Sequence, residues 1–261
     1  MFIKNILLGI IMGIGFIVPG VSGGVIATIL GIYNTIIYKL NHLFDNFKNN
    51  ILYILPIIIG ILISIFSFSK LILYLINNRL EFISYVFIGL ILGCVPYLIK
   101  EIKIKEKKGI SIIPFSLAFV FGILLYIIQN SNLIENNNIT PFKLIIAGLL
   151  YSIGKIVPGI SGAALLMLIG VYNYFLSIIA NPILINIKLI IYFIPFILSF
   201  LISSIIILKL IEYLLNNYFR ITYSIIIGFV LSSILFIYPN TISLLDIIIS
   251  ILSFIISYYL S

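Results

Sequence analysis

Residues 18–24 read Val-Pro-Gly-Val-Ser-Gly-Gly, and residues 157–162 read Val-Pro-Gly-Ile-Ser-Gly. The offset is 158 − 19 = 139 residues, and it holds without a gap from Gly9/Gly148 to Gly89/Gly228. Residues 5–100 therefore match residues 144–239. Equivalent segments broken by Pro and Gly in two halves of one chain are typical of membrane transporters built from two structural repeats.

The composition places the chain in a lipid bilayer. Hydrophobic residues make up 63% of the sequence and charged residues 8%, and the mean hydropathy is +1.34. A water-soluble domain of this length would expose large apolar patches with such a composition. Long apolar runs predict six membrane spans, at 51–76, 82–100, 112–129, 188–215, 221–238 and 242–259.

Several functional classes are excluded by residue types that are rare in the chain. One cysteine (Cys94) and one histidine (His42) cannot form a multi-cysteine metal site or a two-histidine phosphatase site. No dense acidic cluster is present to hold catalytic metals, so we expect neither an enzyme nor a metal site. The net charge of +8 comes largely from loop lysines, which set topology and attract anionic lipids, so no nucleic-acid partner is expected.

Two segments, residues 5–37 and 143–177, do not fit as simple spans. Each is too long for one span and is interrupted by the Pro-Gly motif. Such a break leaves backbone groups open at membrane depth, which is tolerated only inside protein or beside water. We expect each segment to form a re-entrant hairpin whose break faces a cavity, and two full crossings remain the alternative.

The topology follows from one loop that carries five lysines, Lys100, Lys103, Lys105, Lys107 and Lys108. The positive-inside rule makes this loop cytoplasmic. Counting spans from it places both termini in the cytoplasm and gives the two hairpins opposite directions of insertion. We therefore expect an all-α polytopic protein with one membrane domain, 1–261, made of two inverted repeats at 5–129 and 143–259. Each repeat is a re-entrant hairpin followed by three transmembrane helices.

The two breaks predict an anion site. After each Pro-Gly a new helix must begin, and Ser22 and Ser161 stand where an N-cap is needed. Two helix starts, one from each leaflet, could hold one anion near the midplane, and phosphate fits best. The alternative is that each motif only kinks a helix and allows close packing.

Charged residues within apolar segments are candidates for contacts to that anion. Lys155 precedes Pro158 by three residues, and its repeat equivalent is Phe16. Lys70 and Lys209 are repeat equivalents and could receive a head group at opposite membrane faces, or simply reach the interface. The remaining polar candidates are given structural roles: Arg79, Arg220, Tyr33 and Tyr172 as interface anchors, and Glu212 as a partner that neutralises Lys209.

With both motifs followed by Gly-Ile-Tyr or Gly-Val-Tyr, the chain resembles a bacterial family catalogued as domain of unknown function 368. Its members are linked to polyprenyl-phosphate transport of the PopT type. The resemblance implies a translocase that returns undecaprenyl phosphate from the outer to the cytoplasmic leaflet of the bacterial plasma membrane, for recycling in cell-wall synthesis. The signature positions that it implies are Pro19, Gly20, Ser22, Gly23, Gly24, Pro158, Gly159, Ser161 and Gly162.

This sequence departs from the family pattern at four positions. Many relatives carry a polar residue where Phe16 stands, Thr for Val25, an acid for Asn34 and Ser for Ala163, so the polar lining is thinner here. The expected partners are the lipid substrate and membrane lipids, and the oligomeric state is left open.

Inward movement of a negative head group against a membrane potential costs about 2.3 kcal/mol per charge at about 100 mV. A co-transported H⁺ or Na⁺ would offset it, and carbonyls before Pro19 and Pro158 could coordinate such a cation. A secondary transporter of a small soluble anion is the alternative function.

Overall fold

The computed structural model describes residues 2–17, 22–130, 139–172, 174–175, 187–239 and 241–260, with residues 15–17, 69–78, 80, 187–192 and 260 described by their backbone only. Every regular element in these ranges is helical. The elements are α1 (Phe2–Ile17), α2 (Gly23–Ile29), α3 (Tyr33–Asn41), α4 (Phe47–Asn78), α5 (Leu80–Glu106), α6 (Ile112–Asn130), α7 (Pro141–Ile156), α8 (Gly162–Leu168), α10 (Ile187–Asn217), α11 (Phe219–Ser232), the short 3₁₀ turn η2 (Ser233–Phe236) and α12 (Leu244–Leu260).

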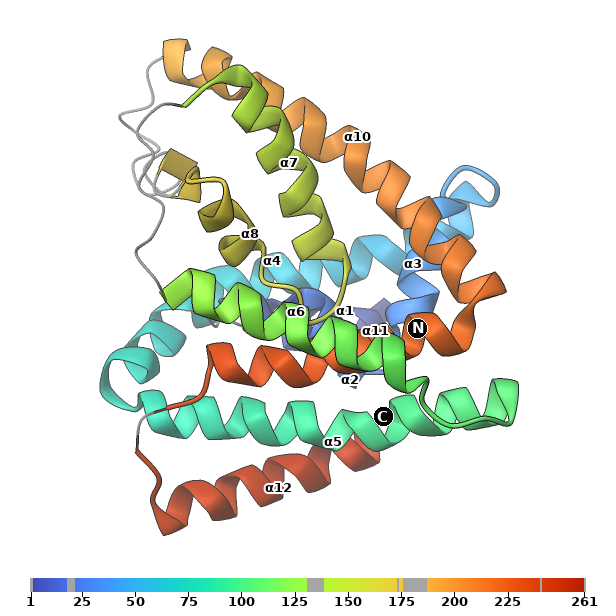
Figure 1. Ribbon diagram of the computed structural model, residues 1–261, viewed down its shortest axis with the longest axis vertical. Helices are drawn as coiled ribbons and strands as arrows, with labels where there is room; N and C mark the ends of the chain where they lie inside the picture. Colours follow the sequence, from blue (N-terminus) through green and yellow to red (C-terminus); the bar gives the residue numbers. More distant parts are fainter. Residues whose placement is uncertain are drawn as a thin grey trace.

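The sequence repeat is visible in the helix bounds. The offset of 139 residues maps α1 onto α7 and α2 onto α8 at both ends, since 2 + 139 = 141 and 23 + 139 = 162. The packing repeats as well: α1 lies along α4 as α7 lies along α10 (Figure 1). In contrast, α5 packs against α12 and α11 packs against α6, so the last helix of each repeat is held by the other repeat.

Five of the described helices are long and apolar enough to span a membrane: Phe47–Phe68, Glu81–Glu106, Ile112–Asn130, Phe193–Asn217 and Phe219–Phe236. These correspond to five of the six predicted spans. The sixth, 242–259, forms the shorter apolar helix Leu244–Tyr259. Ser243 and Asp246 cap this helix reciprocally, because the Ser243 N–H donates to Asp246 Oδ2 (2.9 Å) and the Asp246 N–H donates to Ser243 Oγ (3.2 Å), so the helix begins at Leu244. The number and length of these apolar helices are those of a multi-pass membrane protein.

The hairpin helices are interrupted more often than the sequence predicted. Helices α2 and α8 contain seven residues each, and two residues after their ends lie Gly31 and Gly170, whose φ angles are +65° and +74°. Backbone hydrogen bonds from Ile32 to Ala27 and from Gly31 to Thr28 close the end of α2 in a Schellman motif, and α8 ends in the same way. After this turn α3 departs from α2 at 117°. The Gly-x-Tyr sequence is therefore a second break.

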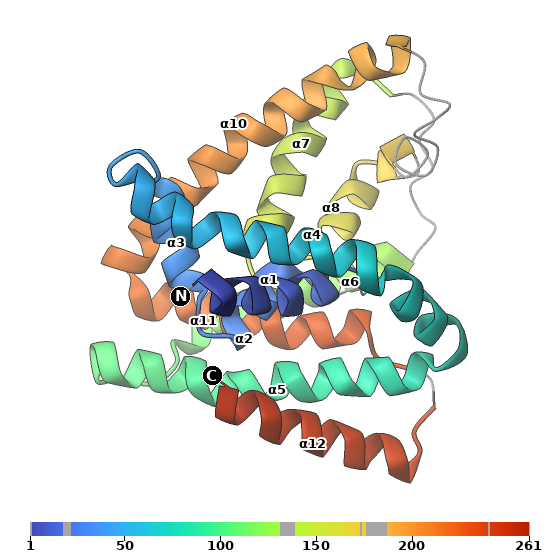
Figure 2. The same cartoon turned by 180° about the vertical axis from the view of Figure 1, so that it is seen from behind.

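The core lies around α2, α5 and α11. All seven residues of α2 are buried, and the span of α11 is the most buried of the five. Helices α6 and α10 are the least buried of the five spans and expose many apolar side chains, as a lipid-facing helix does. Helix α10 runs beside α7 along the outer edge of the bundle (Figure 2). Glycines allow the closest pairs to form: a Cβ on Gly9 would overlap the carbonyl of Ile57, so α1 and α4 touch through their backbones.

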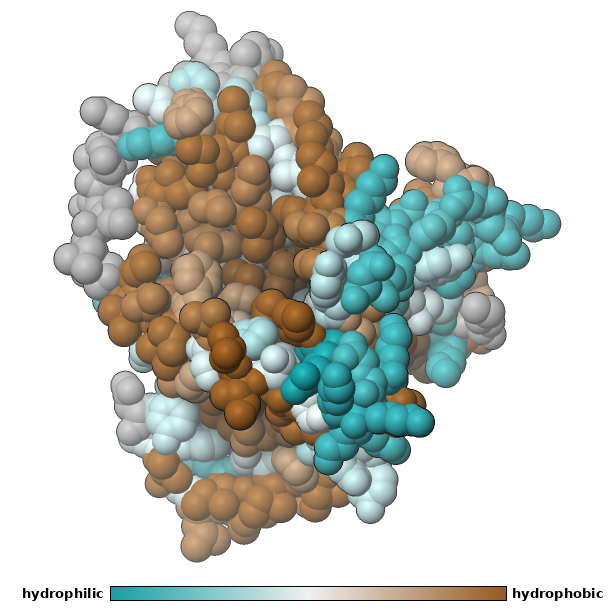
Figure 3. All heavy atoms as spheres, turned by 45° about the vertical axis from the view of Figure 1, so that its right-hand side comes forward, coloured by the Kyte–Doolittle hydropathy of each residue, from teal (hydrophilic) through white to brown (hydrophobic). Residues whose placement is uncertain are grey.

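Polar loops gather at one end of the bundle. The lysine-rich end of α5 reaches α10 through a hydrogen bond from Lys105 Nζ to the Leu215 carbonyl (3.4 Å), and Arg220 Nε donates to the carbonyl of Gly109 (2.7 Å). Figure 3 shows hydrophilic residues concentrated on this side, beside a largely apolar surface. At the other end, Thr241 joins the start of α12 to α5, because its carbonyl accepts from Tyr85 Oη (3.1 Å).

Candidate functional site

The two Pro-Gly breaks lie in contact with each other. The backbone N–H of Gly159 points at Ser22 Oγ, at 3.4 Å, although the two residues are 137 positions apart. Gly24 lies against the second break as well, since a Cβ added to it would stand 3.2 Å from Pro158 Cα. These contacts bring four residues of the two motifs together, and an anion site between the motifs stays a prediction. Pro19 and Gly20 lie outside the described residues.

Each break is followed by a helix with a serine N-cap, as predicted. Ser22 Oγ accepts from the backbone N–H of Val25 (3.3 Å), and Ser161 Oγ accepts from that of Ala164 (3.2 Å). Both serines have extended backbones, which turn the chain into the new helix. Gly23 and Gly162, the first residues of α2 and α8, have no side chain to shield the helix start. This allows close packing at both helix starts: Gly23 is buried, and Gly162 lies against Gly154.

Ser161 has a second partner that sequence reasoning missed. Its hydroxyl donates to Oε1 of Gln129, at 3.2 Å, near the end of α6. The only signal in the sequence is a polar residue at the end of an apolar span, where polar residues are ordinary. Because Gln129 Oε1 accepts from Ser161, the amide group of Gln129 is held at the second break.

Replacing Ser161 with alanine is expected to destabilise the second hairpin. The change removes the N-cap acceptor and leaves Gln129 Oε1 without this donor, so the free energy of unfolding should fall by about 1–2 kcal/mol. Thermal unfolding in detergent measures the loss. Ser161→Thr keeps the hydroxyl and serves as the control, and a melting temperature for Ser161→Ala equal to that of Ser161→Thr would contradict the expectation.

Tyr33 links the hairpins at a second point. Its side chain is 6% exposed, and its hydroxyl donates to the carbonyl of Ile156 at 3.2 Å. That carbonyl is the last of α7, and it lacks its helical partner because the N–H of Ile160 bonds to Val157 instead. The interpretation of Tyr33 as an interface anchor is therefore wrong: the break opened a backbone acceptor, and tertiary packing supplied the donor.

Lys155 lies in the last turn of α7, immediately before the second break. Its side chain is exposed, and Nζ stands 5.0 Å from the centre of the Tyr151 ring. A cation over an aromatic face is stabilised without losing its charge. The structure thus places the amino group of Lys155 on the last turn before Pro158, and its contact with an anion stays a prediction.

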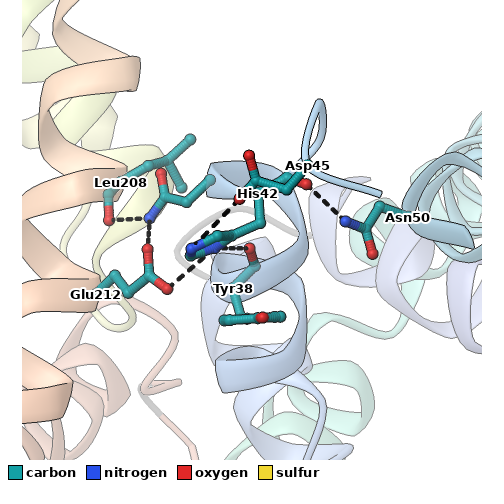
Figure 4. Close-up of polar contacts among 7 residues, drawn as sticks. Tyr38, His42, Asp45, Asn50, Leu208 and Glu212 are labelled. Atoms are coloured by element: carbon teal, nitrogen blue, oxygen red, sulfur yellow. Dashed lines mark hydrogen bonds and ion pairs between the residues drawn. The ribbon is translucent and has the colours of Figure 1, made fainter. Parts of the chain in front are cut away.

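Of the other two predicted lysines, the structure describes the side chain of Lys209 alone. Lys209 is exposed on α10, beside the residues that hold the end of α3, and the side chain of Lys70 lies outside the described part of the structure. Glu212 does not fulfil its predicted pairing with Lys209. It accepts from Asn41 Nδ2 (2.7 Å) and lies 3.3 Å from His42 Nδ1 (Figure 4).

The contact of Glu212 involves His42, the one histidine of the sequence. Its ring stacks on Tyr38 and lies between Glu212 and Asp45 (Figure 4). Asn41 adds a hydrogen bond to the Leu208 carbonyl at 2.8 Å. The first hairpin is therefore attached to α10 of the second repeat through polar side chains, at the end opposite its break.

Arg220 supports the lysine-rich loop. Its Nε and Nη2 donate to the carbonyls of Gly109 and Ile110, and its backbone N–H donates to Glu106 Oε1 at 2.9 Å. These contacts agree with the structural role predicted for it.

Comparison with known proteins places the chain in a family. A family model described as VCA0040-like, undecaprenyl phosphate translocase-like, matches residues 12–251. A polyprenyl-phosphate transporter of Staphylococcus aureus is 32% identical over 253 residues, which cover 90% of this chain and 86% of the relative. One of Vibrio cholerae is 30% identical over 187 residues, 66% of this chain and 58% of the relative. No solved structure matches. Because the family model spans nearly the whole chain, including both breaks, this protein belongs to the VCA0040-like family of undecaprenyl phosphate translocase-like proteins.

Proposed function

We propose that this protein moves undecaprenyl phosphate from the outer to the cytoplasmic leaflet of a bacterial plasma membrane, so that the carrier is reused in cell-wall synthesis. Two relatives named polyprenyl-phosphate transporters, one of them matched over 90% of this chain, support transport of a lipid phosphate. The protein acts as a carrier and not as an enzyme, since translocation changes no covalent bond of the lipid.

The contact between Ser22 and Gly159 is the observation that carries this proposal. It brings the cap of α2 against the second break. In the proposed site, Ser22, Gly23 and Gly24 hold the phosphate together with the backbone of the second break. Lys155 supplies the full positive charge. The isoprenoid tail stays in lipid along the apolar outer helices, so only the head group needs a polar route. Lys70 and Lys209 receive the head group at opposite faces.

An inverted arrangement of the repeats belongs to the proposal. It requires the loops 42–46, 107–111 and the turn at 218 to share the cytoplasmic face with both termini. The contacts of His42 with Glu212 and of Arg220 with Gly109 join these three segments at one end, which supports the arrangement. The contact of Tyr85 with Thr241 joins the start of α5 to the loop before α12, and both lie at the end that the proposal assigns to the outside.

Single cysteines test this topology. In a Cys94→Ala background, Lys108→Cys and Asn217→Cys should react with a membrane-impermeant maleimide only after the cytoplasmic face is opened. Thr241→Cys should react in intact cells. The opposite pattern would place the lysine-rich loop outside and reject the proposed orientation, whereas reaction of all three in intact cells would reject the separation of the two faces.

Transport itself is tested in proteoliposomes that contain fluorescent undecaprenyl phosphate. Addition of an impermeant quencher reports how much lipid has left the outer leaflet. The native protein should speed this movement over protein-free vesicles, and millimolar inorganic phosphate should compete weakly because it lacks the tail. Uptake of radioactive inorganic phosphate without lipid movement would overturn the lipid substrate and support a small soluble anion instead.

A further inference from the structure

Helix α3 belongs to the first hairpin in the sequence, but it is held mainly by the second repeat. It packs against α10 more extensively than against α2 or α4 of its own repeat. At its start, Tyr33 Oη donates to the Ile156 carbonyl, and Asn34 Nδ2 donates to Tyr223 Oη at 2.6 Å. These bonds hold the start of α3 beside the second break, because Ile156 is the last residue of α7.

Glu212 of α10 holds the other end of α3. Its Oε2 accepts from Asn41 Nδ2 at 2.7 Å, and its Oε1 lies 3.3 Å from His42 Nδ1 (Figure 4). The Asn41 amide, which has two protons, also donates to the Leu208 carbonyl of α10 (2.8 Å). The side chain of Glu212 is 16% exposed, so removal of these donors would leave a carboxylate with little access to water. Asn41, His42 and Glu212 form the α3 latch.

The α3 latch is present in one repeat only. The offset of 139 residues maps Asn41 onto Ala180 and Glu212 onto Leu73. Neither alanine nor leucine has a polar side-chain group, so the sequence of the second hairpin cannot form the same contacts. The two hairpins therefore differ in how they are attached to the rest of the protein.

Aromatic rings attach the second hairpin to α10. Tyr151 of α7 and Phe175 pack against Phe196, at 5.8 Å and 5.5 Å between ring centroids, and Phe193 stacks on Phe196 at 4.5 Å. The equivalent positions in the first repeat are aliphatic: Met12, Ile36, Ile57 and Ile54. Aromatic pairs attract each other beyond the burial of their surface, whereas aliphatic contacts in a bilayer gain little over contacts with lipid tails. The first hairpin is thus the less firmly packed of the two.

Both ends of α3 adjoin turns that permit it to move as a unit. The turn at Gly31 bends the chain by 117° between α2 and α3, and glycine allows the backbone there to take other conformations. The polar turn 42–46 follows α3, and the proposed orientation places it on the cytoplasmic face. Helix α3 therefore runs from the breaks to that face. Hinges next to a short helix are typical of gating elements.

We propose that α3 is a cytoplasmic gate. Held by the α3 latch, it closes the way from the breaks to the cytoplasmic face, and its release from Glu212 opens that way while the aromatic rings keep the second hairpin in place. The gate rests on the proposed function, in which the head group leaves the breaks toward the cytoplasm. The α3 latch is formed here, so this structure represents the closed state.

The first test measures access to Thr28, which is 3% exposed and lines a small hollow at the start of α3. The full-length protein with Thr28→Cys and Cys94→Ala is placed in lipid nanodiscs, where both membrane faces meet the solution. Its reaction with a water-soluble maleimide should be slow. Glu212→Ala should speed this reaction by about tenfold or more, because it removes the charged acceptor that holds Asn41.

Tyr213→Phe is the matched control, since it changes the exposed residue next to Glu212 and should leave the reaction slow. Native Cys94, which is 0% exposed, reports unfolding in samples without the Thr28→Cys reporter, and it should stay unreactive in Glu212→Ala. A reaction of Thr28→Cys that Glu212→Ala leaves unchanged, or that rises only together with the reaction of Cys94, would overturn the gate.

The second test holds the gate closed during lipid movement in proteoliposomes. Asn41→Cys and Glu212→Cys, in a Cys94→Ala background, are joined by a cleavable bis-methanethiosulfonate linker. Lipid movement should fall to the level of protein-free vesicles and return when dithiothreitol cleaves the linker. The control pair Ile145→Cys and Ser199→Cys joins α7 to α10, where the Ser199 hydroxyl already donates to the Ile145 carbonyl, and linking it should leave the rate unchanged.

The two tests separate the gate from the transport itself. Lipid movement that continues at the native rate with α3 linked to α10 rejects the gate and retains the proposed function. A Thr28→Cys reaction that responds to Glu212→Ala, in a protein that moves no lipid, retains the movement of α3 and rejects the transport.

Discussion

Replacing Gly159 with alanine is expected to prevent stable folding of the second hairpin. Gly159 has a φ of +82°, a conformation that an L-residue adopts at a cost of about 1–2 kcal/mol. A Cβ at this position would also overlap the backbone carbonyl of Phe229 in α11, and a backbone atom cannot rotate aside as a side chain can. Overpacking of this kind adds about 1–3 kcal/mol, for a total loss of about 2–5 kcal/mol.

The measurement is the yield of monodisperse protein in detergent, together with its melting temperature. Gly109→Ala is the control, because a Cβ there meets no atom within 4 Å. It should behave as the native protein does. If Gly159→Ala is as stable as Gly109→Ala, the close approach of the second break to α11 is wrong.

Replacing Lys155 with glutamine is expected to slow lipid translocation by about 10- to 150-fold. The change removes a charge-assisted hydrogen bond to the phosphate, which contributes about 1.5–3 kcal/mol. The first repeat cannot compensate, since Phe16 stands at the equivalent position. Lys155→Arg retains the charge and should keep a larger share of the rate. Initial rates in proteoliposomes, normalised to the amount of folded protein, provide the measurement.

Lys143→Gln is the matched control for this experiment, because it removes a lysine from the same helix, at its first turn. Its translocation rate should stay near the native rate. The melting temperature of Lys155→Gln, which loses the contact with Tyr151, is measured separately so that a loss of stability is distinguished from a loss of transport. Native speed in Lys155→Gln would remove this lysine from the site, and equal slowing in both variants would point to the net charge of the protein.

The serine caps and the ends of the long helices are features that the sequence predicts well. Ser22 and Ser161 each accept a hydrogen bond from the backbone N–H three residues later, so a local sequence pattern is sufficient to predict these caps. The second break, at Gly31 and Gly170, also has a local signal, because the glycine occurs at the same place in both halves of the sequence. Our predictions from the sequence contain only the Pro-Gly breaks. The physical signal is a glycine at the C′ position, which ends a helix.

Other parts of the site required long-range information. Tyr33 meets Ile156 across 123 residues, and Asn34 meets Tyr223 across 189. Each of these residues has an ordinary role as an interface or loop residue in the sequence alone. The pairing of Glu212 with His42 shows the same difficulty, since the nearest opposite charge in the sequence, Lys209, is not its partner. Spacing along one helix cannot report a contact that another helix provides.

Hydropathy and local hydrogen bonding thus account for the bilayer location, the duplicated plan, the positions of the Pro-Gly breaks and the starts of the helices that follow them. These properties depend on residues that are close in the sequence and on the surrounding solvent, and the composition of the chain indicates that this solvent is lipid. Tertiary packing decided which helices pair and which side chains meet at the breaks. Within a bilayer, burial of apolar surface cannot choose between partners, because lipid tails are as apolar as leucine. The choice is made by close contacts such as Gly159 with α11 and by a few hydrogen bonds such as Tyr33 with Ile156.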